Sequence, residues 1–284
     1  MSYKVILCEG DSWTSGDIIN PELEEQGTTW INDPQNDEYR LPKVWPHKLG
    51  THLNEVEVIN NSEAGSSNDG IVRRVIPKVL NLLKEYNSED IFVIIGWTSP
   101  ERKDFYCNYH RDSLAPRWET LYPAELWQEQ LIDDIKKFYE IYLKYYWNIE
   151  EYSSRYMQQV LLISNFLKNK GINHKFFNGF YESYGQDFGG DLYRKYFLNK
   201  RRGMPEAMTP ELKDEMEDLY GDIDDLLYQE YLGIYDEDFL KKTFKKNCDE
   251  NEKVWSEKWV NNHPNERMHT LWAEFIYKEI FEDG

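Results

Sequence analysis

Short apolar runs alternate with polar, glycine-containing stretches and amphipathic segments along the first hundred residues of the chain. Strands are expected at residues 4–7, 56–59 and 90–95, where β-branched and aromatic residues follow one another. A short helix is expected at residues 44–53, where Pro46 suits the first turn, and a longer one at 71–83, where apolar residues recur every three or four positions. The third strand is apolar throughout, which is typical of a central parallel strand covered on both faces.

Three successive strand-loop-helix units predict an α/β fold with a layered, mostly parallel sheet. In such folds the loops that follow the strands meet at one edge of the sheet, where binding sites gather. Each of the three strands is followed by a polar loop that contains glycine, beginning at Gly10, Asn60 and Gly96. We therefore expect these three loops to converge.

The rest of the chain is less regular. Residues 13–43 and 101–122 are expected to be mostly loop, a long helix should begin at Pro123, and a further helix and strand are expected at residues 154–170 and 175–178. We interpret residues 1–284 as one domain with insertions at about 101–150 and 181–250. The second insertion is a candidate helical lid, and an insertion that only packs on the side or mediates self-association is an equal alternative.

Charge and cysteine content narrow the possible partners. With 33 Lys and Arg against 52 Asp and Glu, the formal net charge is −19, which disfavours binding to nucleic acid or to anionic membrane surfaces. The sequence contains no signal peptide and no apolar run long enough to span a membrane, so a cytoplasmic protein is expected. Its three cysteines are far apart, which predicts neither a disulfide framework nor a zinc site.

No metal site is expected elsewhere either. Asp222, Asp224 and Asp225 lie close together but lack the glycine and terminal glutamate of a calcium loop, so a solvated helix face is favoured.

Two residues far apart in the sequence are candidates for nucleophilic catalysis. Ser12 follows the first strand in the turn Gly10-Asp11-Ser12, where two stiff elements can hold its hydroxyl, although a plain polar turn is the alternative. His263 precedes Pro264, which pushes it out of helical conformation and onto a loop. We expect Ser12 and His263 to be hydrogen-bonded neighbours, with His263 as the general base.

Four blocks of the sequence, taken in order, resemble the SGNH or GDSL-type hydrolases. They are Gly10-Asp11-Ser12, Ala64-Gly65-Ser66-Ser67-Asn68, Gly96-Trp97-Thr98 and His263-Pro264-Asn265. The resemblance covers roughly residues 1–100, 155–180 and 255–284, outside the two insertions. It implies a three-layer, flavodoxin-like sandwich with a mostly parallel central sheet and helical insertions.

The resemblance also implies roles for single residues. Ser12 would be the nucleophile, the Ser12 and Gly65 backbone N–H groups would donate to the oxyanion, and Asp11 and Trp97 would belong to the binding site. The family usually has asparagine where this chain has Thr98, so either Thr98 or the neighbouring Asn68 would be the third donor. It also has an aspartate near the position of Asn261, so the histidine here would be oriented by Asn261, by a carboxylate from elsewhere, or by no third residue.

Two functions follow as expectations. The first is a serine esterase that needs no cofactor and cleaves a small acyl ester, such as that of an acetylated carbohydrate. The second is an inactive SGNH-type binding or structural protein, favoured by the departures at Thr98 and Asn261. The loop at residues 96–102 resembles the form in tailed-phage proteins, which implies a bacterial host cytoplasm or a virion. The oligomeric state stays open.

Overall fold

A parallel four-stranded sheet forms the centre of the protein. The computed structural model describes residues 3–18, 20–25, 34–54, 56–100, 102–107, 117–121, 136–138, 141–142, 145–146, 149–178 and 264–282. The strands are β1 (Val5–Glu9), β2 (Glu57–Asn60), β3 (Ile91–Trp97) and β6 (Asn173–Asn178), in the order β2-β1-β3-β6. Leu7 lies opposite Ile59 on one side and Val93 on the other, so β1 is a central strand.

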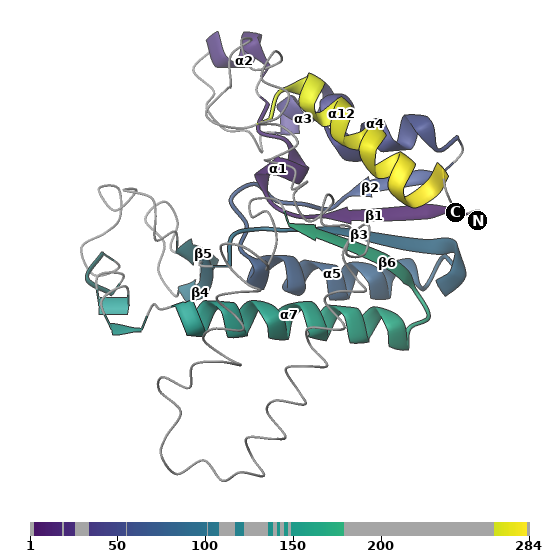
Figure 1. Ribbon diagram of the computed structural model, residues 1–284. Helices are drawn as coiled ribbons and strands as arrows, with labels where there is room; N and C mark the ends of the chain where they lie inside the picture. Colours follow the sequence, from purple (N-terminus) through teal and green to yellow (C-terminus); the bar gives the residue numbers. More distant parts are fainter. Residues whose placement is uncertain are drawn as a thin grey trace.

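Helices cover both faces of this sheet (Figure 1). Helices α5 (Asn68–Leu82) and α7 (Ile149–Asn169) pack on one face, and α4 (Trp45–His52) and α12 (Glu266–Tyr277) pack on the other. A short π-helical segment, Lys278–Glu282, follows α12. The fold is therefore a three-layer α/β sandwich with a parallel central sheet, as predicted.

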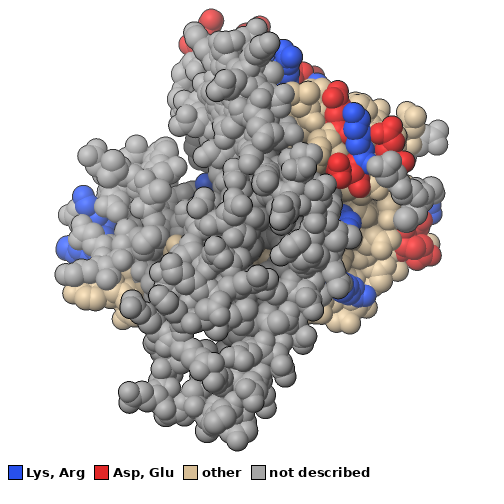
Figure 2. Space-filling model, viewed as in Figure 1, with Lys and Arg blue, Asp and Glu red and all other residues tan. Residues whose placement is uncertain are grey.

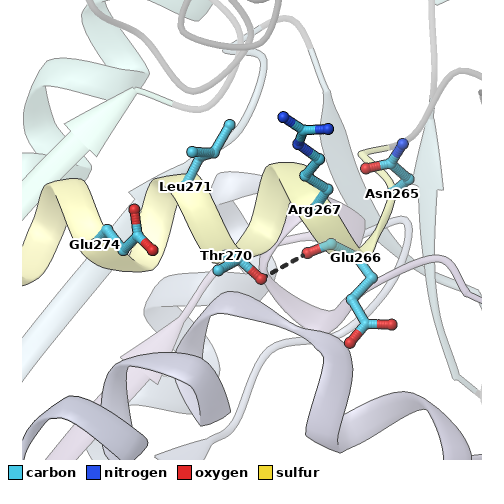
Figure 3. A pocket seen from close by; sticks show the side chains of 6 residues that line it. All are labelled: Asn265, Glu266, Arg267, Thr270, Leu271 and Glu274. Carbon is cyan, nitrogen blue, oxygen red and sulfur yellow. Dashed lines mark hydrogen bonds between the residues drawn. The ribbon is translucent and has the colours of Figure 1, made fainter. Parts of the chain in front are cut away.

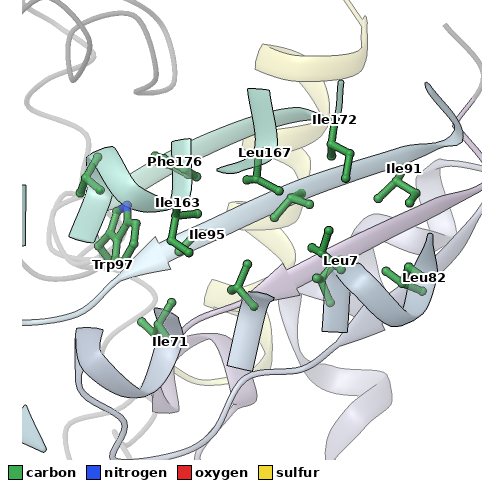
Figure 4. Packing of buried hydrophobic residues seen from close by; sticks show 14 of the residues in the cluster. Leu7, Ile71, Leu82, Ile91, Ile95, Trp97, Ile163, Leu167, Ile172 and Phe176 are labelled. Carbon is green, nitrogen blue, oxygen red and sulfur yellow. The ribbon is translucent and has the colours of Figure 1, made fainter. Parts of the chain in front are cut away.

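The alternation of side chains along the strands divides the core into two clusters. Val5 and Leu7 of β1 point toward α5 and α7, whereas Ile6 and Cys8 point toward α4 and α12, because successive side chains of a strand lie on opposite faces. Figure 4 shows the first cluster, in which residues of β1 and β3 pack against both helices. All four of these β1 side chains are fully buried, which explains why the run is continuously apolar.

A hydrogen bond and an ion pair join the C-terminal helix to α4. The backbone N–H of Trp45 donates to Nδ1 of His269 at 3.2 Å, in the buried interior of this layer. At the surface, Lys48 Nζ lies 2.8 Å from a Glu266 carboxylate oxygen. Acidic and basic side chains are intermingled on the described surface in the upper right of Figure 2.

The stretch expected to be mostly loop, residues 13–43, instead contains short helices. They are α1 (Ser12–Ser15), α2 (Pro21–Glu25), α3 (Pro34–Arg40) and the 3₁₀ segment Leu41–Lys43. Asn36 fixes α3 against the preceding chain, since it accepts from Asn20 N at 2.9 Å and donates to Ile18 O at 2.8 Å. These helices are too short to produce an apolar period in the sequence, and for this reason the prediction was wrong.

The described part of the stretch expected to be irregular, residues 101–122, contains a β-hairpin. Strands β4 (Lys103–Cys107) and β5 (Arg117–Leu121) pair antiparallel, with Asp104 opposite Thr120 and Tyr106 opposite Trp118. Five-residue strands rich in charged residues resemble loop in a sequence, so their pairing had no clear signal. The hairpin lies beyond the carboxyl edge of the main sheet, beside α5 and α7 (Figure 1).

Several boundaries differ from the expected ones. Helix α5 begins at Asn68 rather than Ile71, because the Ser67 side chain caps it by accepting from Gly70 N. Helix α7 begins at Ile149 rather than residue 154, and β3 continues through Gly96 and Trp97. Of the helix expected from Pro123, the structure describes helical residues at 136–138, 141–142 and 145. The insertion at 181–250 lies outside the described residues. None of the helices that the structure describes has both the length and the apolar character of a membrane span.

Candidate active site at the carboxyl edge of the sheet

The loops that follow β1 and β3 lie at a point where the chain turns to opposite faces of the sheet. After β1 the chain continues toward α4 on one face, and after β3 it continues toward α7 on the other. In open α/β sheets this reversal leaves a crevice beyond the carboxyl ends of the two strands, where ligands bind. Gly10-Asp11-Ser12 and Thr98 stand at these two ends.

Asp11 shapes the turn that presents Ser12. It is the N-cap of α1: its Oδ1 accepts from Trp13 N at 3.0 Å, and its backbone carbonyl accepts from Thr14 N and Ser15 N. Ser12 is therefore the first residue of α1, with 6% of its surface exposed. The turn also needs a glycine before Asp11, because a Cβ at Gly10 would collide with the Thr14 side chain.

The second carboxylate oxygen of Asp11 joins the turn to the loop after β3. Oδ2 accepts a hydrogen bond from the Thr98 hydroxyl at 2.6 Å and lies 3.2 Å from Nη1 of Arg102. The same Arg102 nitrogen donates to the backbone carbonyl of Ser66 at 3.1 Å. Asp11 and Arg102 thereby hold together the loops that follow all three of the first strands.

Asn68 and Thr98 form a second link between these loops. The Asn68 side chain accepts from Thr98 N at 2.9 Å and donates to Thr98 O at 3.0 Å, and both residues are 2% exposed. This arrangement resembles the pairing between two strands, with a carboxamide in place of one backbone. It fixes Asn68 in one orientation and uses one of its two amide hydrogens.

These contacts change the expectation for the third oxyanion donor. The Thr98 hydroxyl, which was one candidate, donates its single hydrogen to Asp11. Asn68, the other candidate, keeps a second amide hydrogen beyond the one that it donates to Thr98 O. Of the two side chains, Asn68 is therefore the one with a hydrogen left to donate.

Gly65 lies in the loop between β2 and α5 and has a backbone φ of 76°, a conformation that favours glycine. Two hydrogen bonds hold this loop: Glu63 N donates to Gly10 O at 3.3 Å, and Ser66 N donates to Glu63 O at 3.2 Å. The first of them ties the loop to the turn that precedes Ser12. The segments that carry Ser12 and Gly65 are therefore neighbours, as the predicted site requires.

Trp97 is the last residue of β3, but its side chain points into the hydrophobic core. Its side chain is 1% exposed and packs edge-on against Tyr156 and Phe176, beneath α7. Because β3 continues one residue past Gly96, the alternation of the strand turns Trp97 inward (Figure 4). The structure therefore gives Trp97 a packing role, in contrast to the binding role expected from its position in the third block.

The proposed base His263 and its partner Asn261 lie outside the described residues. The last helix begins at Glu266, with Asn265 as its N-cap, whose side chain accepts from Met268 N at 3.1 Å. Pro264 is buried and lies two residues before the start of the helix. His174 and His269 have their Nδ1 atoms within hydrogen-bond distance of Ile172 O and Trp45 N, so both are built into the packed layers.

Several charged residues that the sequence did not indicate also belong to this edge. Glu9, immediately before the turn, is wholly buried and pairs with Arg74 of α5 at 2.6 Å. Burial raises the pKa of Glu9 to about 7, an effect that Arg74 partly offsets. Arg155 of α7 donates to Pro100 O at 2.9 Å and to Arg102 O at 3.2 Å, and these two bonds attach the loop after β3 to α7. The sequence feature that could have indicated Glu9 is its position, as an acidic residue at the end of an apolar strand.

The hairpin is anchored to the same region through two aspartates. Asp104 accepts from Ser67 Oγ at 2.6 Å and from Thr120 Oγ1 at 2.8 Å, and it pairs with Arg73. Asp69 accepts from the backbone N–H of Asp104 at 3.0 Å. The hairpin is thus attached to the first turn of α5, next to Asn68.

An open groove of about 630 Å³ runs along the outer side of α12 (Figure 3). Its lining residues are Asn265, Glu266, Arg267, Thr270, Leu271 and Glu274. Its first lining residue in the sequence, Asn265, comes two positions after His263. No described residue of the loops after β1 and β3 lines the groove. Within the described parts of the chain, no group of three His, Cys, Asp or Glu residues could hold a metal ion.

Comparison with solved structures finds weak similarity to several GDSL-family proteins. A lipolytic G-D-S-L protein from Veillonella parvula DSM 2008 is 12% identical, with a TM-score of 0.43 over 98% of both chains. One from Desulfitobacterium hafniense DCB-2 is 14% identical, with a TM-score of 0.42 over 98% of this chain and 99% of that one. An acetylxylan esterase from Geobacillus stearothermophilus is 13% identical, with a TM-score of 0.41 over 99% and 95%.

No curated protein matches the chain. The model of a family of unknown function, DUF6071, matches residues 24–190. The matched range includes Gly65, Asn68 and Thr98, whereas Ser12 and His263 lie outside it. Because the match covers more than half of the 284 residues, the chain belongs to the DUF6071 family.

Proposed function

We propose that this protein is a serine ester hydrolase that acts on a small acyl ester, with acetylated carbohydrates as the substrate class to test first. The observation that carries the proposal is the linked edge: Asp11 presents Ser12 at the end of β1 and bonds to Thr98 at the end of β3. Each of the first three blocks that resemble SGNH hydrolases contributes a residue to this network. The fourth, with His263, is taken from the resemblance.

The reaction would proceed in two steps. Ser12 Oγ attacks the ester carbonyl carbon while His263 accepts the hydroxyl proton, and the tetrahedral intermediate expels the alcohol, which takes that proton. Water then attacks the acyl-enzyme, and His263 again transfers the proton, which releases the acid and restores Ser12. The oxyanion would accept from the backbone N–H groups of Ser12 and Gly65 and from the second amide hydrogen of Asn68.

The experiment compares two serines of the same short helix. A fluorophosphonate probe should label the wild type at Ser12, and Ser12→Ala should lose both labelling and hydrolysis of p-nitrophenyl acetate. Ser15→Ala is the matched control, because Ser15 is also buried and its hydroxyl has no hydrogen-bond partner among the described residues. Hydrolysis that survives Ser12→Ala would overturn the proposal.

A binding protein without catalysis is the second candidate. It is favoured by the Thr98 hydroxyl being committed to Asp11, which leaves the third block without its side-chain donor, and by asparagine at position 261. Such a protein would bind an acylated ligand without turning it over. Stoichiometric labelling of Ser12 by the fluorophosphonate would contradict this candidate, since labelling requires an activated hydroxyl.

A further inference from the structure

Glu9 is a charged residue at a position where the strand pattern calls for an apolar one. It follows Val5 and Leu7 on the same face of β1, toward α5, and none of its surface is exposed. Its carboxylate accepts four hydrogen bonds: from Gly10 N at 3.1 Å, Asn61 Nδ2 at 2.7 Å, and Arg74 Nε and Nη2 at 3.1 and 2.6 Å. Both oxygens of the carboxylate therefore accept hydrogen bonds from protein groups.

Arg74 extends this network to the neighbouring loop. Besides its two bonds to Glu9, the guanidinium donates to Gly10 O at 3.3 Å and to a Glu63 carboxylate oxygen at 2.8 Å. Glu63 N also donates to Gly10 O, so this carbonyl accepts hydrogen bonds from both Arg74 and Glu63. One ion pair thus fixes the turn before Ser12, the loop before Gly65 and the helix α5 relative to each other.

A buried ion pair of this kind often contributes little net stability to a fold. Removing a carboxylate and a guanidinium from water costs free energy that their mutual attraction often fails to recover, and well-packed apolar residues of similar volume are commonly as stable or more so. The raised pKa of Glu9, about 7, reflects this cost, because burial outweighs the favourable effect of Arg74. A contribution other than stability is the better explanation for the pair.

We propose that Glu9 and Arg74 act together as a positioning pair that sets the Ser12 turn against the Gly65 loop. The inference rests on the proposed function, in which these two segments donate to the same oxyanion. Neither side chain touches the substrate in this scheme; both act through the backbone of Gly10 and the side chains of Asn61 and Glu63. A displacement of about 1 Å between two such donors is enough to cost roughly a hundredfold in rate.

Arg73 supplies a matched control for Arg74. It is the preceding residue on α5, and it pairs with Asp104 at 2.6 Å, the distance at which Arg74 pairs with Glu9. Arg73, however, holds the hairpin through Asp104 and Trp118, and among the described residues it does not contact the Ser12 turn or the Gly65 loop. Arg74→Lys and Arg73→Lys therefore each remove a guanidinium that pairs with a carboxylate, from two different parts of the fold.

The kinetic test measures kcat and KM with p-nitrophenyl acetate for the wild type, Glu9→Gln, Arg74→Lys and Arg73→Lys. We expect Glu9→Gln and Arg74→Lys to lower kcat by about tenfold to a hundredfold with KM changed less than threefold, and Arg73→Lys to stay within twofold of the wild type. Plotted against pH, kcat of the wild type should also fall more steeply toward acidic pH than kcat of Glu9→Gln. The other titratable groups near the pair are Cys8 on β1 and Glu63 on the loop, and both remain in that variant.

Amide hydrogen exchange provides a readout that does not depend on catalysis. Loss of protection at residues 10–15 and 61–66 in Glu9→Gln and Arg74→Lys, but not in Arg73→Lys, is the expected result. Unchanged protection there, or an unchanged kcat despite lost protection, would overturn the positioning role. If the wild type neither hydrolyses esters nor reacts with the fluorophosphonate, the proposed function fails, while the exchange data still decide whether the pair fixes the two loops.

Discussion

The Thr98 hydroxyl donates a 2.6 Å hydrogen bond to Oδ2 of Asp11, across 87 positions of sequence. This bond joins the residue that caps α1 to the residue that follows β3, so β1 and β3 are connected at their carboxyl ends. Thr98 therefore shapes this edge of the sheet, and the Asn68 side-chain amide keeps one hydrogen beyond the one that it donates to Thr98 O.

Replacing Thr98 by valine should therefore affect stability first. The variant keeps the shape of the side chain but leaves Asp11 with one fewer donor in a buried site, so the free energy of unfolding should fall by about 1.5–3 kcal/mol. Urea titration measures this change. Thr98→Ser, which retains the hydroxyl, should lose less than half as much, and equal losses in both variants would show that the methyl group matters more than the bond.

Asn68→Asp should lower both stability and ester hydrolysis. A carboxylate can still accept from Thr98 N, but its second oxygen would face the Thr98 carbonyl with no hydrogen between them. We expect a loss of about 2–3 kcal/mol in the free energy of unfolding and a fall in kcat of at least tenfold. Asn81→Asp, at an exposed position on the same helix, controls for the added charge. Full activity in Asn68→Asp would remove Asn68 from the oxyanion site.

Trp97→Phe distinguishes packing from substrate binding. Trp97 Nε1 has no hydrogen-bond partner in the described structure, so the substitution removes ring volume and no bond. The free energy of unfolding should fall by about 1–2 kcal/mol, and Trp97→Ala should cost about 3–5 kcal/mol. KM for p-nitrophenyl acetate should remain within threefold of the wild type in Trp97→Phe. A selective rise in KM would restore the binding role expected from the sequence.

The titration of Glu9 should appear in the pH dependence of stability. Its pKa is raised from about 4.5 to about 7 on folding, so the folded state binds the proton more tightly than the unfolded state. The stability that this proton confers is complete below about pH 4.5, decreases as the pH rises, and is lost above about pH 7. The difference in free energy of unfolding between the wild type and Glu9→Gln should follow this curve, with a span of roughly 3 kcal/mol at most. A difference that is constant from pH 4.5 to 8 would contradict it.

The strands and layers of this fold could be predicted because burial on both faces leaves a local signal. Residues 5–8 of β1 and 91–95 of β3 are continuous apolar runs, and each is followed within two residues by a glycine. That pattern was enough to indicate a parallel sheet and the edge where the loops meet. The position of Ser12 at the end of the first strand followed directly.

The contacts of the site could not be predicted, since they depend on distances between residues far apart in the sequence. Trp97 was expected at the site because it follows Gly96, but β3 continues to pair with β6 up to Asn178, and this turns the ring into the core. Arg74, the partner of Glu9, is 65 positions away on α5. The apolar period of that helix does not indicate which of its polar residues faces Glu9. Such pairings become visible only when the layers are assembled.

The covering of one face of the sheet by α12 has a consequence for how the protein is made. Ile6 and Cys8 of β1 belong to the same buried cluster as Met268 and Trp272, near the other end of the chain. During translation, the first strand leaves the ribosome long before the helix that shields it. Until residues 266–277 have emerged, α4 alone can shield that side of the nascent sheet, and the rest of the face is accessible to a chaperone.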